Sequence, residues 1–443
     1  MRGTEQSPHL LIQAVSHCRL FRAVITASLL GLVGCGQSSA PPVEQAELEW
    51  EPTPVQLERT PSPSGAKGEF SDGKVVLASS ETMENRPEKG SAEWLLMEIA
   101  RLRNLPVDQV RESVPGRPGE FVDRTLSEEE ARQERLSRHR KTVELAMQTI
   151  SKTHQDESAT ELFNSAVHFL VDARTQLALA GDHDQVRILD ENAEALFQRD
   201  PTSFAAVDAG AHLVELAHQL AQRHAESDPQ WALAFARQAR LFAERFPQET
   251  SKAAVNLIAA GKMCERLKLD DEAETCLAVV EQIAPGSPYA EQVAGSLRRL
   301  RLPGQQLTQF GGSTFDGEFT SIERYRGTPL IIAFWASNSE EFRQTLPTIQ
   351  SLVDESRGKL KVVGVNMDRD ERAVERFLLE TGIDWKQIFY SDPEKRGLMN
   401  VVARHYGVTR VPEYWLVDAD GVVRSIHLDP MNLKEEIELA LTP

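Results

Sequence analysis

The pattern of apolar and polar positions divides the chain into four stretches. An uncharged apolar run, Ala23 to Gly34, lies within residues 1–35, and residues 36–92 show no apolar period. Residues 93–300 repeat apolar positions at helical spacing, whereas residues 301–443 alternate short β-rich apolar runs with amphipathic segments. We therefore expect a multidomain protein in which an all-α region precedes an α/β domain with a mixed sheet.

The helical stretch contains a repeat signal from Ala254 to Pro285. Counted from Ala254, the small residues Gly261 and Ala273 stand at positions 8 and 20, where two helices of a hairpin approach closely, and Pro285 stands at 32 and ends the second helix. This spacing resembles the tetratricopeptide repeat. We expect stacked helical hairpins whose concave face binds a peptide or protein. The alternative is a helical spacer that binds nothing.

The last stretch predicts a sheet with helices on both faces. Strands are expected over residues 329–336, 359–366, 413–418 and 422–428, and helices over 339–356, 370–381 and 432–441. Asp420 and Gly421 supply the turn between the last two strands. The order strand–helix–strand, helix, hairpin and helix is typical of a mixed sheet in an α/β domain.

Composition narrows the classes of protein. The chain has 443 residues, four cysteines and a net charge of −18. The negative charge argues against nucleic acid as a partner. The small number of cysteines excludes a disulfide scaffold, and no uncharged apolar run reaches the length of a membrane span.

The N-terminus has the features of a targeting segment. Arg2, Arg19 and Arg22 precede the apolar run, which ends in Leu-Val-Gly before Cys35. This ending resembles the bacterial lipoprotein box, which implies that Cys35 is lipidated and that the protein is anchored in the cell envelope outside the cytoplasm. The proline-rich residues 36–92 would then be a disordered tether. The alternative is a short buried segment that happens to end in cysteine.

Two further cysteines, Cys264 and Cys276, lie on the two helices of the repeat-like hairpin. They either form one structural disulfide or remain buried thiols. Helix-pair geometry often misses the narrow range of distances that a disulfide needs, which favours the thiols.

The C-terminal stretch resembles the TlpA/ResA branch of thioredoxin-fold proteins, close to the redoxins. The resemblance is carried by the segment TFDGEFTSIERYRGTPLIIAFWAS and by Val411-Pro412 before EYWLVDADG. It implies a thioredoxin fold, a cis-proline loop at Pro412, and the activity of a thiol–disulfide oxidoreductase or antioxidant protein.

The chain departs from this family at the residues that carry the chemistry. Asn338 replaces the tryptophan of the Trp-Cys-x-x-Cys motif, Ser339 replaces the attacking cysteine, and Phe342 replaces the resolving cysteine. A serine hydroxyl is not ionised at neutral pH and cannot form a mixed disulfide. We expect no catalytic residue and a structural capping box between Ser337 and Glu340. An extended peptide would bind along the motif turn and the cis-proline loop, at Trp335, Asn338, Ser339, Val411 and Pro412.

The spacing of residues does not indicate a metal or cofactor site. The histidines show no metal-ligand motif, and His212, His218 and His224 lie six apart, which predicts solvated side chains; no metal or cofactor is expected. The sequence therefore favours a lipid-anchored extracytoplasmic protein that binds or scaffolds protein or peptide partners through its repeats and groove. The alternative is an oxidoreductase that draws on Cys264 and Cys276 or on a partner's thiol.

Overall fold

The computed structural model describes residues 87–113, 121–429 and 432–441. The predicted leader, the lipidation site at Cys35 and most of the predicted tether lie outside these ranges. Within them, no helix is long and apolar enough to cross a membrane.

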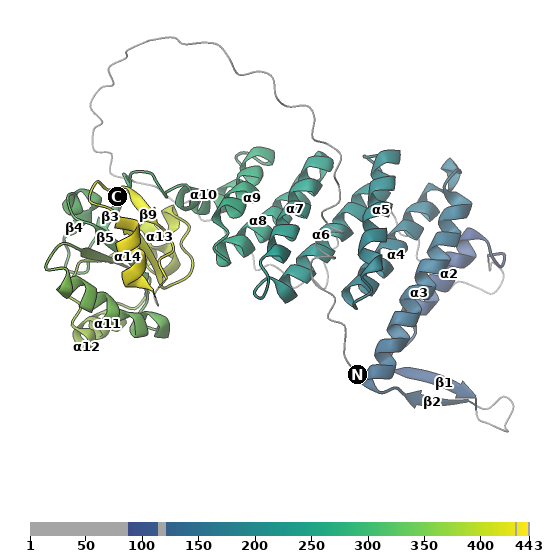
Figure 1. Ribbon diagram of the computed structural model, residues 1–443. Coiled ribbons are helices and arrows are strands. Elements are labelled where there is room, and N and C mark those ends of the chain that lie inside the picture. Colours follow the sequence, from purple (N-terminus) through teal and green to yellow (C-terminus); the bar gives the residue numbers. More distant parts are fainter. Residues whose placement is uncertain (1–86, 114–120, 430–431, 442–443) are drawn as a thin grey trace, which may run out of the picture.

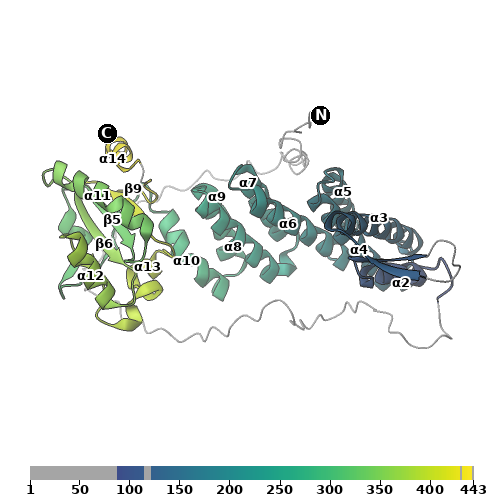
Figure 2. The same cartoon turned by 90° about the horizontal axis from the view of Figure 1, so that it is seen from below.

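A row of helices leads from the N-terminal end of the described chain to the C-terminal domain (Figures 1 and 2). Serine side chains cap several of these helices, as Ser127 does in a capping box with Glu130. The helices pack as antiparallel neighbours, as the repeat signal predicts. They are α2 (Ala92–Asn104), α3 (Glu128–Thr153), α4 (Thr160–Leu179), α5 (Asp184–Arg199), α6 (Phe204–His224), α7 (Gln230–Arg245), α8 (Thr250–Arg266), α9 (Asp270–Ile283) and α10 (Pro288–Leu300).

A β-hairpin interrupts the region that the sequence predicts to be all helical. Strands β1 (Gln109–Ser113) and β2 (Phe121–Thr125) pair antiparallel between α2 and α3. The side chains of both strands are almost all exposed, so neither strand has the apolar alternation by which a half-buried strand is detected. The prediction of a purely helical region is wrong at this hairpin.

Helices α8 and α9 form the hairpin that carried the repeat signal. A Cβ atom built on Gly261 would lie 2.6 Å from Cδ2 of Leu277, and Ala273 is fully buried nearby. The small residues thus allow the close helix approach that the spacing predicts.

The C-terminal domain contains a five-stranded sheet in the order β7-β6-β5-β8-β9. Strands β5 (Leu330–Trp335) and β6 (Lys361–Asn366) are parallel, β8 (Glu413–Val417) runs antiparallel to β5, and β7 (Gln387–Ile388) and β9 (Val423–Ser425) form the edges. The connecting helices are α11 (Glu340–Glu355), α12 (Glu371–Thr381), α13 (Val401–His405) and α14 (Leu433–Leu441). The predicted mixed sheet is confirmed.

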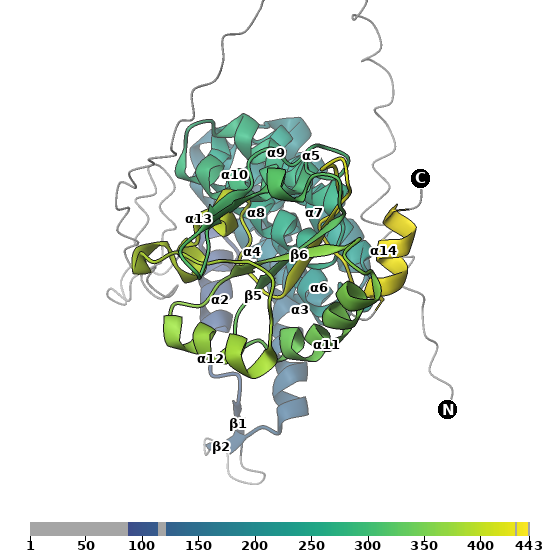
Figure 3. The same cartoon turned by 90° about the vertical axis from the view of Figure 1, so that its left-hand side faces the viewer.

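The two faces of this sheet are covered by different parts of the chain. Helices α11, α12 and α14 cover the face that presents Ile331, Ala333 and Trp335. The other face, with Ile332 and Phe334, packs against α13 and joins the apolar core of the helical region. Figure 3, seen along the long axis, shows the C-terminal domain in front of the helices. One apolar core therefore runs across the junction between the two regions.

A buried cluster of charges fixes this junction. Arg299 of α10 donates to Oε1 of Glu265 at 2.9 Å and to the main-chain oxygen of Tyr406 at 2.8 Å, and its Nε lies 3.6 Å from Oε1 of Glu413. His427 and Asp270 form a second contact across the junction, 3.1 Å apart. The helical region is thereby attached next to the first residue of β8.

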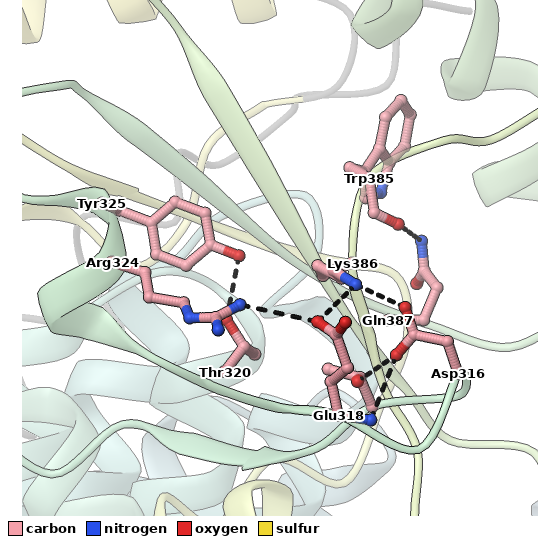
Figure 4. A network of polar contacts seen from close by, with 9 residues as sticks. Asp316, Glu318, Thr320, Arg324, Tyr325, Trp385, Lys386 and Gln387 are labelled. Carbon is pink, nitrogen blue, oxygen red and sulfur yellow. Dashed lines mark hydrogen bonds and ion pairs between the residues drawn. The ribbon is translucent and has the colours of Figure 1, made fainter.

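A second β-hairpin with an Asp316-Gly317 turn lies beside edge strand β7, formed by β3 (Gly311–Ser313) and β4 (Phe319–Ser321). Figure 4 shows how Lys386 ties it to β7: the ammonium group binds both Asp316 and Glu318, the latter at 2.9 Å. The bond to Lys386 is the largest cause that lowers the pKa of Asp316, to about 2. This cluster is largely exposed and links the β3–β4 hairpin to the edge of the main sheet.

Candidate functional site

The sheet register brings two loops to one end of the domain. Phe334 of β5 pairs with Glu413 of β8, and the strands are antiparallel. The turn that follows β5, residues 336–339, and the loop that precedes β8, ending in Pro412, therefore leave the sheet side by side. The Val411-Pro412 peptide bond is cis, as the family resemblance implies. Both residues of this loop are half-buried, so part of their surface remains accessible.

The turn after β5 ends at the N-terminus of α11. Ser339 is the N-cap, and its hydroxyl accepts a hydrogen bond from the main-chain N–H of Phe342 at 3.2 Å. The predicted capping box between Ser337 and Glu340 is wrong, because the helix begins two residues later than that box requires. The position of the attacking cysteine is thus held by a side chain that satisfies a helix N–H group.

Ser337 has a different partner, the carboxylate of Asp368. The main-chain N–H and the hydroxyl of Ser337 both donate to this carboxylate at 2.8 Å, and Asn366 donates a third hydrogen bond at 2.7 Å. Sequence reasoning missed Asp368. Its position could have indicated the contact, because Asp368 lies two residues beyond the end of β6. The carboxyl ends of the parallel strands β5 and β6 lie at the same edge of the sheet, so residues that follow them come close together. The three bonds hold the turn in a fixed conformation.

Phe342 fills the position of the resolving cysteine with an aromatic ring. It is fully buried and stacks on Trp335 with 4.8 Å between ring centroids, and Phe377 and Tyr414 lie around the pair. The ring therefore supplies apolar bulk to the core at this position. Trp335 was predicted to contact a ligand, and that prediction is wrong: the side chain has no exposed surface, and its Nε1 donates to Oε1 of Gln387 at 2.8 Å.

Of the predicted groove residues, Asn338 is exposed, and Ser339, Val411 and Pro412 are half-buried. They lie on the two loops at the end of the sheet, whereas Trp335 lies beneath them in the core. The exposed carboxylates of Glu340 and Glu341 occupy the first turn of α11. The surface at this end of the domain is therefore polar, with one apolar contribution from the Val411-Pro412 loop.

Cys264 and Cys276 are free thiols in the structure, fully buried on α8 and α9. The structure therefore has no disulfide bond between Cys264 and Cys276. Burial raises the pKa of Cys264 to about 12 and that of Cys276 to about 11. Both sulfurs thus stay protonated at neutral pH, and a thiol in that state is a poor nucleophile. They are inert packing groups.

One group of side chains in the described part of the chain could hold a metal ion, and it lies in the helical region. It consists of His168, Asp208 and His212. The prediction that His212 is solvated is wrong, because only 17% of its side chain is exposed.

Comparisons with known proteins agree with this geometry. Residues 327–423 match the thioredoxin-like family model Thioredoxin_8. The Thioredoxin-like protein YneN of Bacillus subtilis is 29% identical over 135 residues, which cover 30% of this chain and 75% of that protein. A Thiol:disulfide interchange protein DsbE homolog of Paracoccus denitrificans is 29% identical over 130 residues, covering 29% and 67%.

Among solved structures, a thiol-disulfide oxidoreductase from Bacteroides fragilis is similar, with 21% identity, a TM-score of 0.28 and coverage of 31% of this chain and 100% of that one. The matches define the class: the C-terminal domain is a thioredoxin-like domain related to thiol-disulfide oxidoreductases. The helical region lies outside the family-model match, which begins at residue 327.

Proposed function

We propose that this protein is a redox-inactive thioredoxin-fold scaffold that binds an extended protein segment at the end of its sheet. The observation that carries the proposal is the pair of residues at the motif positions, Ser339 and Phe342. Ser339 caps α11 and Phe342 is part of a buried aromatic cluster. Both replacements stabilise the fold, and neither can donate or accept electrons through sulfur.

Binding does not need the lost cysteines. The exposed Asn338 and the partly accessible Val411-Pro412 loop lie at the ends of neighbouring strands, β5 and β8. The hydrogen bonds between Ser337 and Asp368 keep the turn after β5 in place. A fixed polar turn beside a partly accessible loop suits an extended peptide that forms main-chain hydrogen bonds with the loop. The fused helical hairpins supply a second surface for the same partner.

A lipid anchor at Cys35 would place this scaffold on a membrane outside the cytoplasm. The support is the charged leader, the short apolar run and the lipoprotein-like ending before Cys35. Replacing Cys35 with alanine should move the protein from the membrane fraction to the soluble fraction, as measured by immunoblotting after ultracentrifugation. A variant that stays in the membrane fraction would contradict the lipid anchor.

The absence of redox chemistry is tested on the chain that lacks only residues 1–35. Mixed with insulin and dithiothreitol, it should not accelerate insulin reduction beyond the rate with dithiothreitol alone, and it should not consume peroxide. The physical reason is that Cys264 and Cys276 are buried and protonated. Measurable catalysis in either assay would refute the proposal and favour the oxidoreductase alternative.

Binding is measured separately, by photo-cross-linking of the full chain in cells. A photoreactive amino acid in place of Asn338 should form a cross-link to a partner. The matched control carries the same group at Ser351, which is exposed on α11, about three turns beyond the N-terminus of the helix that follows Asn338. Equal cross-linking at both positions would show that the contact at Asn338 is not specific.

A further inference from the structure

Three polar side chains converge between two helices of neighbouring hairpins. Asp208 and His212 lie four residues apart on α6, so they share one face of that helix. His168 reaches them from α4. One possible ligand atom from each of the three lies within 4.8 Å of the other two.

The carboxylate of Asp208 lies between the two imidazole rings. Its Oδ2 is 3.2 Å from Nδ1 of His168, and its Oδ1 is 3.5 Å from Nδ1 of His212. In a tetrahedral zinc site with metal–ligand bonds of about 2.0–2.2 Å, neighbouring donor atoms lie about 3.3–3.5 Å apart. Both distances are close to that spacing, but they run to different oxygens of the carboxylate, so the side chains must turn slightly to bring one oxygen near both rings, while the helices can stay in place.

We propose that His168, Asp208 and His212 bind one divalent transition-metal ion, Zn²⁺ or an ion with the same ligand preference. Two imidazoles and one carboxylate suit Zn²⁺ and Co²⁺, whereas Ca²⁺ and Mg²⁺ require sets of oxygen ligands. Three protein ligands leave a fourth position for water or for a group from a partner.

The surroundings favour a cation at this position. The side chain of Asp208 is only 14% exposed, so its charge is poorly screened by water, while the 36% exposure of His168 leaves a path from solvent. Asp172, one turn along α4, adds to the negative potential, although Arg103 is paired with it at 2.7 Å.

Metal binding also changes the tautomer of His212. Its Nδ1 lies 2.9 Å from the main-chain oxygen of Asp208, and since that oxygen can only accept, the ring donates its proton there. If Nδ1 is the ligating atom, this hydrogen bond is lost and the ring carries its proton on Nε2 instead. Because a metal ion binds only the neutral imidazole, protons compete with it and binding should weaken as the pH falls. The occupied site would join two successive hairpins and stiffen the solenoid independently of the thioredoxin-like domain.

The test uses the untagged chain, stripped of metal with a chelator and then titrated with Co²⁺ and Zn²⁺. We expect one ion per chain, with the visible absorption of four-coordinate Co²⁺ that Zn²⁺ displaces. Saturating Zn²⁺ should raise the midpoint of thermal unfolding by on the order of 5 °C. Changing a residue that only hydrogen-bonds to a metal ligand weakens metal binding by roughly 10–100-fold. Asp208→Asn and His212→Gln change ligands themselves, so each should weaken binding by more than that.

The matched control is His224→Gln, because His224 is exposed near the end of the same helix. That variant should bind Co²⁺ as the natural chain does. Circular dichroism of each metal-free variant establishes that it is folded. The proposal is overturned if the natural chain binds no Co²⁺ at one per chain, or if Asp208→Asn and His212→Gln bind it as tightly as His224→Gln.

Discussion

Replacing Arg299 with alanine should lower the free energy of unfolding by about 3–5 kcal/mol, because the change leaves buried carboxylates without their cation. The side chain of Arg299 is 5% exposed, and those of Glu265 and Glu413 are 13% and 15% exposed. The main-chain oxygen of Tyr406 loses its hydrogen-bond donor as well. The measurement is denaturant unfolding, followed by far-UV circular dichroism for the helices and by tryptophan fluorescence, to which Trp415, hydrogen-bonded to Glu413, contributes.

The control is Arg301→Ala, two residues further along the chain. Arg301 pairs with Glu274 at 2.8 Å, but its side chain is 47% exposed, so its loss should cost no more than about 1 kcal/mol. The two variants thus separate a buried ion cluster from a surface ion pair. Equal effects would mean that Arg299 does not hold the junction between the two regions.

The pH dependence of the Arg299 variant gives a second check. Burial is the largest cause that raises the pKa of Glu413, and Arg299 opposes it. A carboxyl whose pKa is higher in the folded chain than in the unfolded chain favours folding below the unfolded pKa, and this contribution is lost as the pH rises through the folded pKa. Without Arg299 the pKa of Glu413 should rise further. The stability deficit of Arg299→Ala should therefore shrink from neutral to mildly acidic pH.

The elements of the C-terminal domain could be predicted because their apolar patterns are strict. Six consecutive apolar residues mark β5 in the sequence, and all six are buried in the structure. Helices α11 and α12 begin and end within one residue of the predicted ranges. The same pattern could not show which way Trp335 points. In a strand buried on both faces every position is apolar, so no alternation distinguishes the groove side from the core side.

The polar contacts that define the site were harder to predict because they join residues far apart in the chain. Ser337 and Asp368 are 31 residues apart, and His168 and Asp208 are 40 apart. Nothing in the local spacing of either pair indicates the other member. The capping residue of α11 was misplaced for a related reason: Ser337 and Ser339 both fit a cap, and only the bond from Ser337 to Asp368 decides between them.

Introducing both cysteines, with Ser339→Cys and Phe342→Cys, should create the disulfide reductase activity that we propose the natural chain lacks. A sulfur at the N-cap of α11 would replace the hydroxyl that accepts from the N–H of Phe342, and that position stabilises a thiolate. Its pKa should fall below that of an ordinary cysteine, although the neighbouring carboxylates of Glu340 and Glu341 oppose the shift. The pH dependence of alkylation by iodoacetamide measures the pKa, and insulin reduction measures the activity.

Loss of the Phe342 ring has a cost that must be measured in parallel. The ring is fully buried against Trp335, and truncating such a side chain costs about 3–5 kcal/mol. Ser339→Cys alone keeps the ring and should show the lowered pKa without turnover, because no second sulfur resolves a mixed disulfide. Ser351→Cys, exposed on the same helix, is the reference for an ordinary thiol. If Ser339→Cys folds and alkylates no faster than Ser351→Cys, then the helix end does not activate this position, and the alignment of Ser339 with the attacking cysteine is wrong.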